Sequence, residues 1–335
     1  MITIDGSKGE GGGQILRSSL SLSMATGQPV RFVNLRANRA NPGLMRQHLT
    51  SVLAAARVCS AYVSGADLGA QSLIFEPGPF CHGTYHIAIG TAGSTALVLQ
   101  TLIPAMIMHE GTSSVQIDGG THNTMAPTYD FLANSYLPAL APTQSSMQVN
   151  LVKHGFYPAG GGRLTAEIRG TQKRESIHLD QPGRVTEIHA EAILSTLPQH
   201  IGLREINVCR EGLHVTSAKV RRVDAQGPGN VLTITVRREH VVAVFASCGK
   251  RGLRAEMLAL QLIDRVKRYL DSGAAVEEHL ADQLMVPLAL MGGGSFTTDH
   301  LSSHFTTNVV TIEQFLPVRI RTKDLRGMYQ VEVLQ

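Results

Sequence analysis

The pattern of apolar positions divides the start of the chain into alternating strands and helices. Residues 1–6 read as a short strand and turn, and a glycine-rich turn then leads into a helix that runs to Gly27. Residues 30–35 form a second β-type run, and residues 44–58 carry apolar side chains at helical spacing. Strands that alternate with helices in this way predict an α/β fold.

The same order of elements recurs twice. Helices are expected over residues 95–108 and 129–140, and again over residues 280–291 and 308–315 near the C-terminus. The first helix of each later unit contains a proline four residues after a glutamine, and the proline leaves the glutamine carbonyl without its helical N–H partner. The two pairs are Gln100 with Pro104 and Gln283 with Pro287. This shared detail indicates true internal repetition.

The segment between residues 182 and 273 has a different pattern. Residues 231–236 and 241–245 read as paired strands, and residues 253–270 as an amphipathic helix. This block interrupts the third unit, whose first strands precede it and whose helices follow it. We therefore expect a large domain of repeated units with one small α/β domain inserted. The expected boundaries are 1–181 and 274–335 for the large domain and 182–273 for the insert.

Composition places the chain among ordinary soluble globular proteins. It has 335 residues, of which 43% are hydrophobic and 17% charged, enough for one large or two ordinary domains. The formal net charge of +4 suits an anionic substrate but is too small to require nucleic acid as a partner. Tryptophan is absent and only 5% of residues are aromatic, so no broad base-stacking surface is expected.

The cysteines and the apolar runs bear on the cellular compartment. The four cysteines are scattered without a Cys-x-x-Cys pair, which argues against a disulfide framework and a structural zinc site. The first residues do not resemble a signal peptide, and no apolar run approaches the roughly 20 residues of a membrane span. We expect a cytoplasmic protein that does not enter a membrane.

The glycine-rich turn before the first long helix contains one carboxylate, Glu10, between Gly9 and Gly11. Glycine turns from strand to helix often bind phosphate, although this one matches neither a P-loop nor a dinucleotide fingerprint. A tight structural turn is the alternative interpretation. A carboxylate disfavours phosphate unless a cation joins them, and Mg²⁺ prefers such an arrangement. Glu10 therefore indicates a divalent cation.

Two arginines, Arg36 and Arg39, flank the loop that precedes the second helix, and Gln47 lies on the first turn of that helix. The arginines are in a loop, not on a long solvated helix, so we favour anion binding over a surface role. The planar guanidinium group suits bidentate contacts with phosphate oxygens.

A polar stretch between residues 292 and 308 begins with three glycines and contains His300 and His304. The histidines lie at or just before the predicted helix start, where free N–H groups favour phosphate. Each could be a metal ligand, an acid or base, or a nucleophile, or else a hydrogen-bonded histidine in a polar loop. By the repetition, the loops that carry Arg36, His122 and His304 are equivalent and could converge on one site.

Five ordered motifs together resemble the RNA 3′-terminal phosphate cyclase family over nearly the whole chain. The resemblance implies a large domain of three βαβαββ-type units with a small α/β insert. It also implies ATP-dependent conversion of an RNA 3′-phosphate end into a 2′,3′-cyclic phosphate, with release of AMP and pyrophosphate. The motifs are residues 9–17, 36–43, 154–164 (His-Gly-x-x-Pro-x-Gly-Gly-Gly-x-Leu), 280–283 and 302–308.

The resemblance also implies roles for individual residues. His304, not His300, matches the nucleophile that forms a covalent histidyl-AMP, and Glu10 matches a ligand of Mg²⁺ or Mn²⁺. Positions that match the adenosine pocket are Gln100, Pro127, His279, Leu280, Ala281, Asp282 and Gln283. Positions that match polar residues around the phosphates of ATP or RNA are Arg17, Arg36, Arg39 and Gln47.

The chain differs from the family pattern at one position, His279, and the resemblance does not specify the roles of His122 and His154 or the oligomeric state. His279 stands where the family can have an adenine-stacking tyrosine, and histidine stacks with less area. No role follows for His122 or His154, for which a hydrogen-bonded structural histidine is the favoured interpretation. The implied partners are ATP and RNA 3′-phosphate ends, and the chain could be a monomer or a homodimer.

Two other functions compete with this one. Cyclase-like relatives act in ribosome assembly without adenylation, but they lack the nucleophilic histidine that His304 supplies. Enolpyruvyl transferases share the repeated architecture and bind phosphate with arginines, but they do not use ATP and have no need of a Ser-x-His-x-x-Thr-Asn loop.

Overall fold

Three of the four sheets in the structure share one topology. The structure is a computed structural model that describes residues 1–335. Its first sheet has the order β1-β2-β4-β3, in which β1 and β2 are parallel and the other neighbours antiparallel. These strands are β1 (Ile2–Asp5), β2 (Val30–Val33), β3 (Tyr62–Ser64) and β4 (Leu73–Glu76).

The second and third sheets repeat this arrangement, in the orders β5-β6-β8-β7 and β9-β14-β16-β15. In each sheet the first two strands are parallel and the remaining pairs antiparallel. The α/β fold of repeated βαβαββ units is thereby confirmed. The strands are β5 (Thr84–Ala88), β6 (Gly111–Gly119), β7 (Ser146–Lys153), β8 (Gly162–Gly170), β9 (Ile177–Leu179), β14 (Gly294–Thr298), β15 (Arg319–Asp324) and β16 (Tyr329–Leu334).

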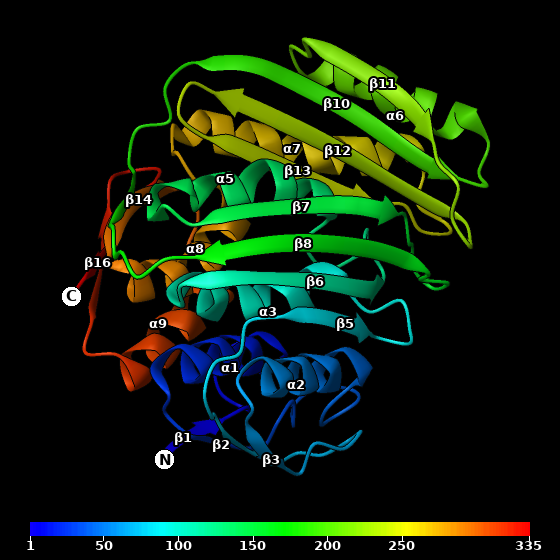
Figure 1. Ribbon diagram of the computed structural model, residues 1–335. Coiled ribbons are helices and arrows are strands. Elements are labelled where there is room, and N and C mark those ends of the chain that lie inside the picture. The colour runs from blue at the N-terminus through cyan, green and yellow to red at the C-terminus, as the bar shows by residue number, and fades with distance from the viewer.

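The first helices of the three units pack together in the middle of the molecule (Figure 1). They are α1 (Gln14–Thr26), α3 (Thr95–Met108) and α8 (Glu278–Met291). Helix α3 is buried from Thr95 to Ile107, because almost all its side chains are apolar. The second helices of the first and third units are α2 (Arg46–Val58) and α9 (Ser303–Phe315). In the second unit this helix is a continuous segment of three parts, which are α4 (Tyr129–Phe131), a π-helix (Leu132–Tyr136) and α5 (Leu137–Ala139).

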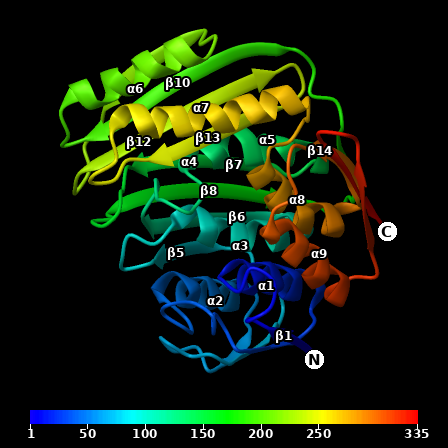
Figure 2. The ribbon, with the colours of Figure 1, turned by 180° about the vertical axis from the view of Figure 1, so that it is seen from behind.

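The fourth sheet is built entirely from the chain between β9 and α8, with the order β11-β10-β12-β13. Helices α6 and α7 cover one of its faces (Figure 2) and share a separate apolar core with it. This matches the expected insertion, while the boundaries at residues 182 and 273 stay a prediction. The elements are β10 (Val185–Ser195), α6 (Gln199–Gly212), β11 (Ser217–Arg222), β12 (Gly229–Arg238), β13 (Val242–Cys248) and α7 (Ala255–Ser272).

The histidine stretch differs from its prediction. Residues 294–298 form strand β14, and α9 begins at Ser303 instead of Asn308. The helix starts early because the side chain of Ser302 accepts a hydrogen bond from the N–H of Phe305 and so caps the helix. His304 therefore lies inside the first turn of α9. No helix of the structure combines the length and the hydrophobicity that a transmembrane span requires.

Candidate active site

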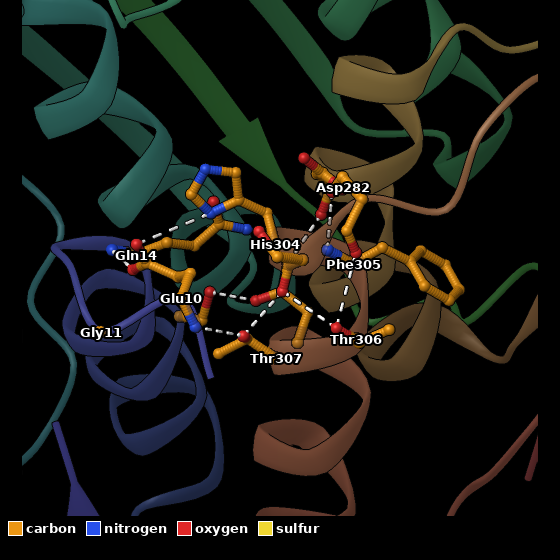
Figure 3. Close-up of polar contacts among 12 residues, drawn as sticks. Glu10, Gly11, Gln14, Asp282, His304, Phe305, Thr306 and Thr307 are labelled. Atoms are coloured by element: carbon orange, nitrogen blue, oxygen red, sulfur yellow. Dashed lines mark hydrogen bonds and ion pairs between the residues drawn. The ribbon is translucent and has the colours of Figure 1, made fainter. Parts of the chain in front are cut away.

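The glycine turn before α1 lies directly against the first turn of α9 (Figure 3). The backbone N–H of Glu10 donates to Oγ1 of Thr307 at 3.0 Å. Gly9 has a φ of +62°, and a β-carbon at this position would lie 2.3 Å from the same Thr307 hydroxyl oxygen. Glycine is thus required both by the backbone conformation and by the close approach of α9. The first and the last repeat meet at this contact.

Glu10 and His304 face each other across this contact. The Nδ1 atom of His304 lies 3.9 Å from Oε2 of Glu10, whose side chain is 4% exposed, whereas that of His304 is 42% exposed. Nδ1 of His304 is buried and has no hydrogen-bond partner, so Nε2 is the ring nitrogen open to a substrate. Burial is the largest cause that lowers the pKa of His304 below 6.5, and the Glu10 carboxylate opposes it. The imidazole is therefore neutral at pH 7.

The other polar residues of the 302–308 motif hold α9 in place. Ser302 Oγ donates to Oδ1 of Asp282 at 2.7 Å, and Asn308 Nδ2 donates to the Asp282 carbonyl oxygen at 2.8 Å. Ser18 on α1 in turn donates to Oδ1 of Asn308 at 2.7 Å. These bonds join α1, α8 and α9 around His304. The hydroxyl three residues before the Phe305 N–H is a capping pattern from which the role of Ser302 could have been predicted, whereas no local pattern indicates that Thr307 accepts from Glu10.

The three arginines of the prediction have different surroundings. Arg39 donates from Nη2 to Oε2 of Glu10 at 2.9 Å, while Arg36 donates to the carbonyl oxygens of Asn41 and Gly43, each at 2.9 Å. Arg17 makes no hydrogen bond or ion pair through its guanidinium group, although burial lowers its pKa to about 10. The Arg17 side chain is half-buried and its guanidinium group has no acceptor in the protein, so it is available to bind an anionic ligand.

The two glutamines that precede the helix prolines lie close together. Gln100 on α3 and Gln283 on α8 line one small cavity of about 30 Å³, which Arg17 and Asn308 also border. Gln100 is 6% exposed, and neither atom of its side-chain amide has a hydrogen-bond partner. An orphaned buried amide next to a free guanidinium indicates a polar ligand at this point.

The predicted pocket residues at the start of α8 differ in how far their side chains are exposed. The carboxylate of Glu277 caps the helix by accepting from the N–H groups of His279 and Leu280. The His279 ring is half-exposed and lies 3.7 Å from Glu278. Leu280 and Ala281 are buried in the core, so only their backbone can face a ligand. Burial raises the pKa of Asp282 to about 8.

The remaining predicted residues lie on neighbouring loops and helices. Gln47 Oε1 accepts from the N–H of Ser94 at 2.8 Å and so joins α2 to the start of α3. Pro127 is half-buried in the loop between β6 and α4. His300 is exposed just before α9 and bonds through its backbone carbonyl to Thr298.

His122 and His154 have the environment of structural histidines. The buried His122 ring bonds to Oδ2 of Asp130 at 2.9 Å and to Oγ1 of Thr121 at 2.8 Å. The His154 ring stacks on it with 5.4 Å between centroids, and Nη1 of Arg221 lies 3.4 Å from its Nε2. Neither ring contacts Glu10 or His304.

Comparison with known proteins gives one consistent result. The family model described as RNA 3′-terminal phosphate cyclase matches residues 8–322. The chain is 46% identical to the RNA 3′-terminal phosphate cyclases of Salmonella paratyphi C (strain RKS4594) and Salmonella agona (strain SL483), over 99% of this chain and 97% of each relative. The protein therefore belongs to the RNA 3′-terminal phosphate cyclase family.

Proposed function

We propose that the protein converts the 3′-phosphate end of RNA into a 2′,3′-cyclic phosphate, with ATP as the co-substrate and AMP and pyrophosphate as the other products. The observation that carries the proposal is the geometry of His304: a neutral imidazole whose Nε2 is open to a ligand and whose Nδ1 faces a buried carboxylate. Such an imidazole is an effective nucleophile.

In the first step Nε2 of His304 attacks the α-phosphorus of ATP. A nitrogen–phosphorus bond forms, the bond to the bridging oxygen breaks, and pyrophosphate leaves. The lone pair must be on Nε2, so the ring proton must be on Nδ1. The Glu10 carboxylate, 3.9 Å from Nδ1, favours this tautomer by its charge. The reaction thus passes through a histidyl-AMP.

In the second step an oxygen of the RNA 3′-phosphate attacks the α-phosphorus of the histidyl-AMP and releases His304. The RNA end then carries AMP through a diphosphate linkage. In the third step the neighbouring 2′-hydroxyl attacks the 3′-phosphorus, its proton is lost, and AMP leaves. This step is intramolecular, and such a gain in effective molarity lowers the barrier by several kcal/mol.

The residues around His304 supply a pocket for each part of ATP. The orphaned Gln100 amide, Gln283 and Asp282 are available to the nucleoside, and the half-exposed His279 ring is available to the base. Arg17 is the guanidinium that lacks an acceptor and so suits the phosphates. The further members of the proposed pocket are Pro127, Leu280 and Ala281 for the nucleoside, and Arg36, Arg39 and Gln47 for the phosphates.

The residues present fit a divalent cation that arrives with the triphosphate. Mg²⁺ is commonly held by one or two carboxylates together with substrate phosphates, and Glu10 is the carboxylate that faces His304. No group of three or more His, Cys, Asp or Glu side chains could enclose an ion by itself. A cation on Glu10, Mg²⁺ or Mn²⁺, would neutralise charge on the departing pyrophosphate.

Labelling with ATP tests the proposal. The protein is incubated with ATP labelled at the α-phosphate and divalent cation, and then with RNA that ends in a 3′-phosphate or a 3′-hydroxyl. We expect label on the protein, its transfer from the protein to the 3′-phosphate RNA alone, and formation of a cyclic end. A ribosome-assembly factor without adenylation, or an enolpyruvyl-transferase-like enzyme, would retain no label, and that outcome would refute the proposal.

A further inference from the structure

A second hydrogen-bond donor approaches the glycine turn beside Arg17. A β-carbon built on Gly13, the residue before α1, would lie 2.4 Å from Nε2 of His48 and 2.8 Å from Nη1 of Arg17. His48 lies on the first turn of α2, the helix that follows the Arg36–Arg39 loop. Two nitrogen-bearing side chains from different helices therefore meet at one point of the backbone, where only a glycine leaves room for them.

The local structure fixes the tautomer of His48. The backbone N–H of Met45, the residue before α2, donates to Nδ1 of His48 at 3.2 Å. This bond uses the lone pair of Nδ1, so the proton of the neutral ring is on Nε2. Burial and the nearby charges of Arg17 and Arg36 lower the pKa of His48 to about 3. The ring is therefore a neutral imidazole that presents an Nε2–H donor toward Gly13.

Neither donor at this point has an acceptor in the protein. Nε2 of His48 makes no hydrogen bond, and the guanidinium of Arg17 makes none either. No carboxylate bonds to either side chain, since Glu10 is paired with Arg39 and with the N–H of Gln14. Two converging donors without an acceptor match the needs of a phosphate oxygen, which accepts several hydrogen bonds.

We propose that His48 is a further phosphate-binding residue of the reaction, which donates its Nε2–H to a phosphate oxygen of ATP or of the RNA 3′ end. The inference rests on the proposed function for the identity of the phosphate. Each ring nitrogen of His48 has its own role: Nδ1 caps α2, and Nε2–H binds the substrate. A neutral donor can hold a phosphate oxygen through the reaction without losing its own proton.

A pair of substitutions separates these roles. The side-chain oxygen of asparagine lies near the position of Nδ1, so H48N keeps an acceptor for the Met45 N–H and loses the donor. The side-chain nitrogen of glutamine lies near the position of Nε2, so H48Q keeps a donor and loses the cap. A replacement of the exposed His200 on α6, H200N, serves as a control.

The rates of two reaction steps and the binding of pyrophosphate are measured for each variant. Single-turnover labelling by ATP reports the ATP phosphates, and transfer from pre-adenylated enzyme to 3′-phosphate RNA reports the RNA phosphate. We expect H48N to slow one of these steps on the order of 100-fold, the scale for removal of one preorganised donor. H48Q should recover a rate within about tenfold of wild type, by the same reasoning. If the ATP phosphates are the ligand, inorganic pyrophosphate should raise the melting temperature of wild type and H48Q but not of H48N.

The outcomes are distinct. Loss of the first step in H48N assigns His48 to ATP, and loss of the second alone assigns it to RNA. If H48N equals wild type in both steps, or if H48Q loses as much as H48N, the inference is wrong and His48 only caps α2. If wild type takes no label from ATP, the proposed function fails, and the pyrophosphate-induced shift then decides by itself whether His48 binds phosphate.

Discussion

The Nδ1 atom of His304 lies 3.9 Å from the Oε2 atom of Glu10, although one residue belongs to the last repeat and the other to the first. The contact exists because the Thr307 hydroxyl, one turn after His304, accepts the Glu10 N–H and so holds α9 on the glycine turn. The proposed nucleophile and its charged neighbour are thus supplied by different repeats.

His304 is expected to carry the AMP. H304A should abolish labelling of the protein by α-labelled ATP, because the lone pair that we propose to attack the α-phosphorus belongs to Nε2 of His304. H300A should retain most of the label, since His300 is exposed in the loop before α9. Mass spectrometry of the labelled protein checks the position directly. AMP on a peptide that lacks His304 would contradict the assignment.

Loss of the Glu10 carboxylate should affect the first step. E10Q keeps an acceptor for the N–H of Gln14 but removes the charge that faces His304 and that would hold the proposed cation. We expect adenylation to slow at least 100-fold, which corresponds to a few kcal/mol of lost charge stabilisation. Single-turnover labelling over a range of Mg²⁺ concentrations measures it, with the exposed E313Q on α9 as the control. An unchanged rate at every Mg²⁺ concentration would exclude a role for Glu10.

The pH dependence of adenylation should reflect His304. Protonation of the ring removes its lone pair, and burial lowers its pKa below the ordinary value of 6.5. The rate should therefore persist as pH falls and decline only below 6.5. In E10Q the residual rate should persist to a still lower pH, because the Glu10 charge raises the pKa of His304. If the adenylation rate of the wild type already declined at or above pH 6.5, burial would not lower the pKa of His304.

Gln100 should strengthen the binding of ATP without stabilising the fold. Q100M replaces a buried amide that has no partner with an apolar side chain of similar shape. Removal of an unsatisfied polar group should leave the free energy of unfolding unchanged or raise it by about 1 kcal/mol. The KM for ATP should rise by about tenfold or more, on the scale of one lost hydrogen bond. Denaturation and labelling kinetics test both parts, and Q199M on the exposed start of α6 is the control. A destabilised Q100M with normal KM would show that the amide serves the fold alone.

The insert should be less stable at high pH because of Glu205. Asn230 Nδ2 donates to Oε1 of the buried Glu205 at 2.7 Å, while Glu205 Oε2 and Asn230 Oδ1 lack partners. Both unpaired oxygens are acceptors, so protonation of the Glu205 carboxyl removes a buried charge and adds the donor that this pair lacks. Burial raises the pKa of Glu205 from 4.5 to about 7, so the folded state holds a proton that the unfolded chain releases between these pH values. The contribution to stability is present below pH 4.5 and is lost as pH rises through 7.

Urea denaturation at pH 5 and pH 8 measures this effect. The wild type should lose about 1 to 3 kcal/mol of unfolding free energy from this group over the interval. E205Q should lose less, because the neutral amide does not ionise between these two pH values. The exposed E211Q on the same helix should behave like wild type. Identical pH dependence in E205Q and wild type would mean that Glu205 is ionised in the folded protein.

Local signals were sufficient for much of the fold. The helix over residues 95–108 was predicted to the residue, because a long and almost entirely apolar run leaves little choice of partner or boundary. The short edge strands, such as β3 and β15, escaped prediction because three to six residues carry too little periodicity. Strand β14 was missed because it directly follows a run of glycines and has only one large apolar side chain, Phe296, and its pairing depends on β9 and β16.

The sequence by itself determined which residues could do chemistry: a carboxylate among glycines, a histidine in a hydroxyl-rich stretch, and two glutamines before prolines. Only the tertiary structure decided what each one faces. It paired Arg39 with Glu10, left Arg17 without an acceptor, and buried Leu280 and Ala281 in the core. Composition and spacing are local, whereas burial and many hydrogen-bond partners are set by segments that lie far away along the chain. The approach of His304 to Glu10 is therefore a property of the folded chain alone.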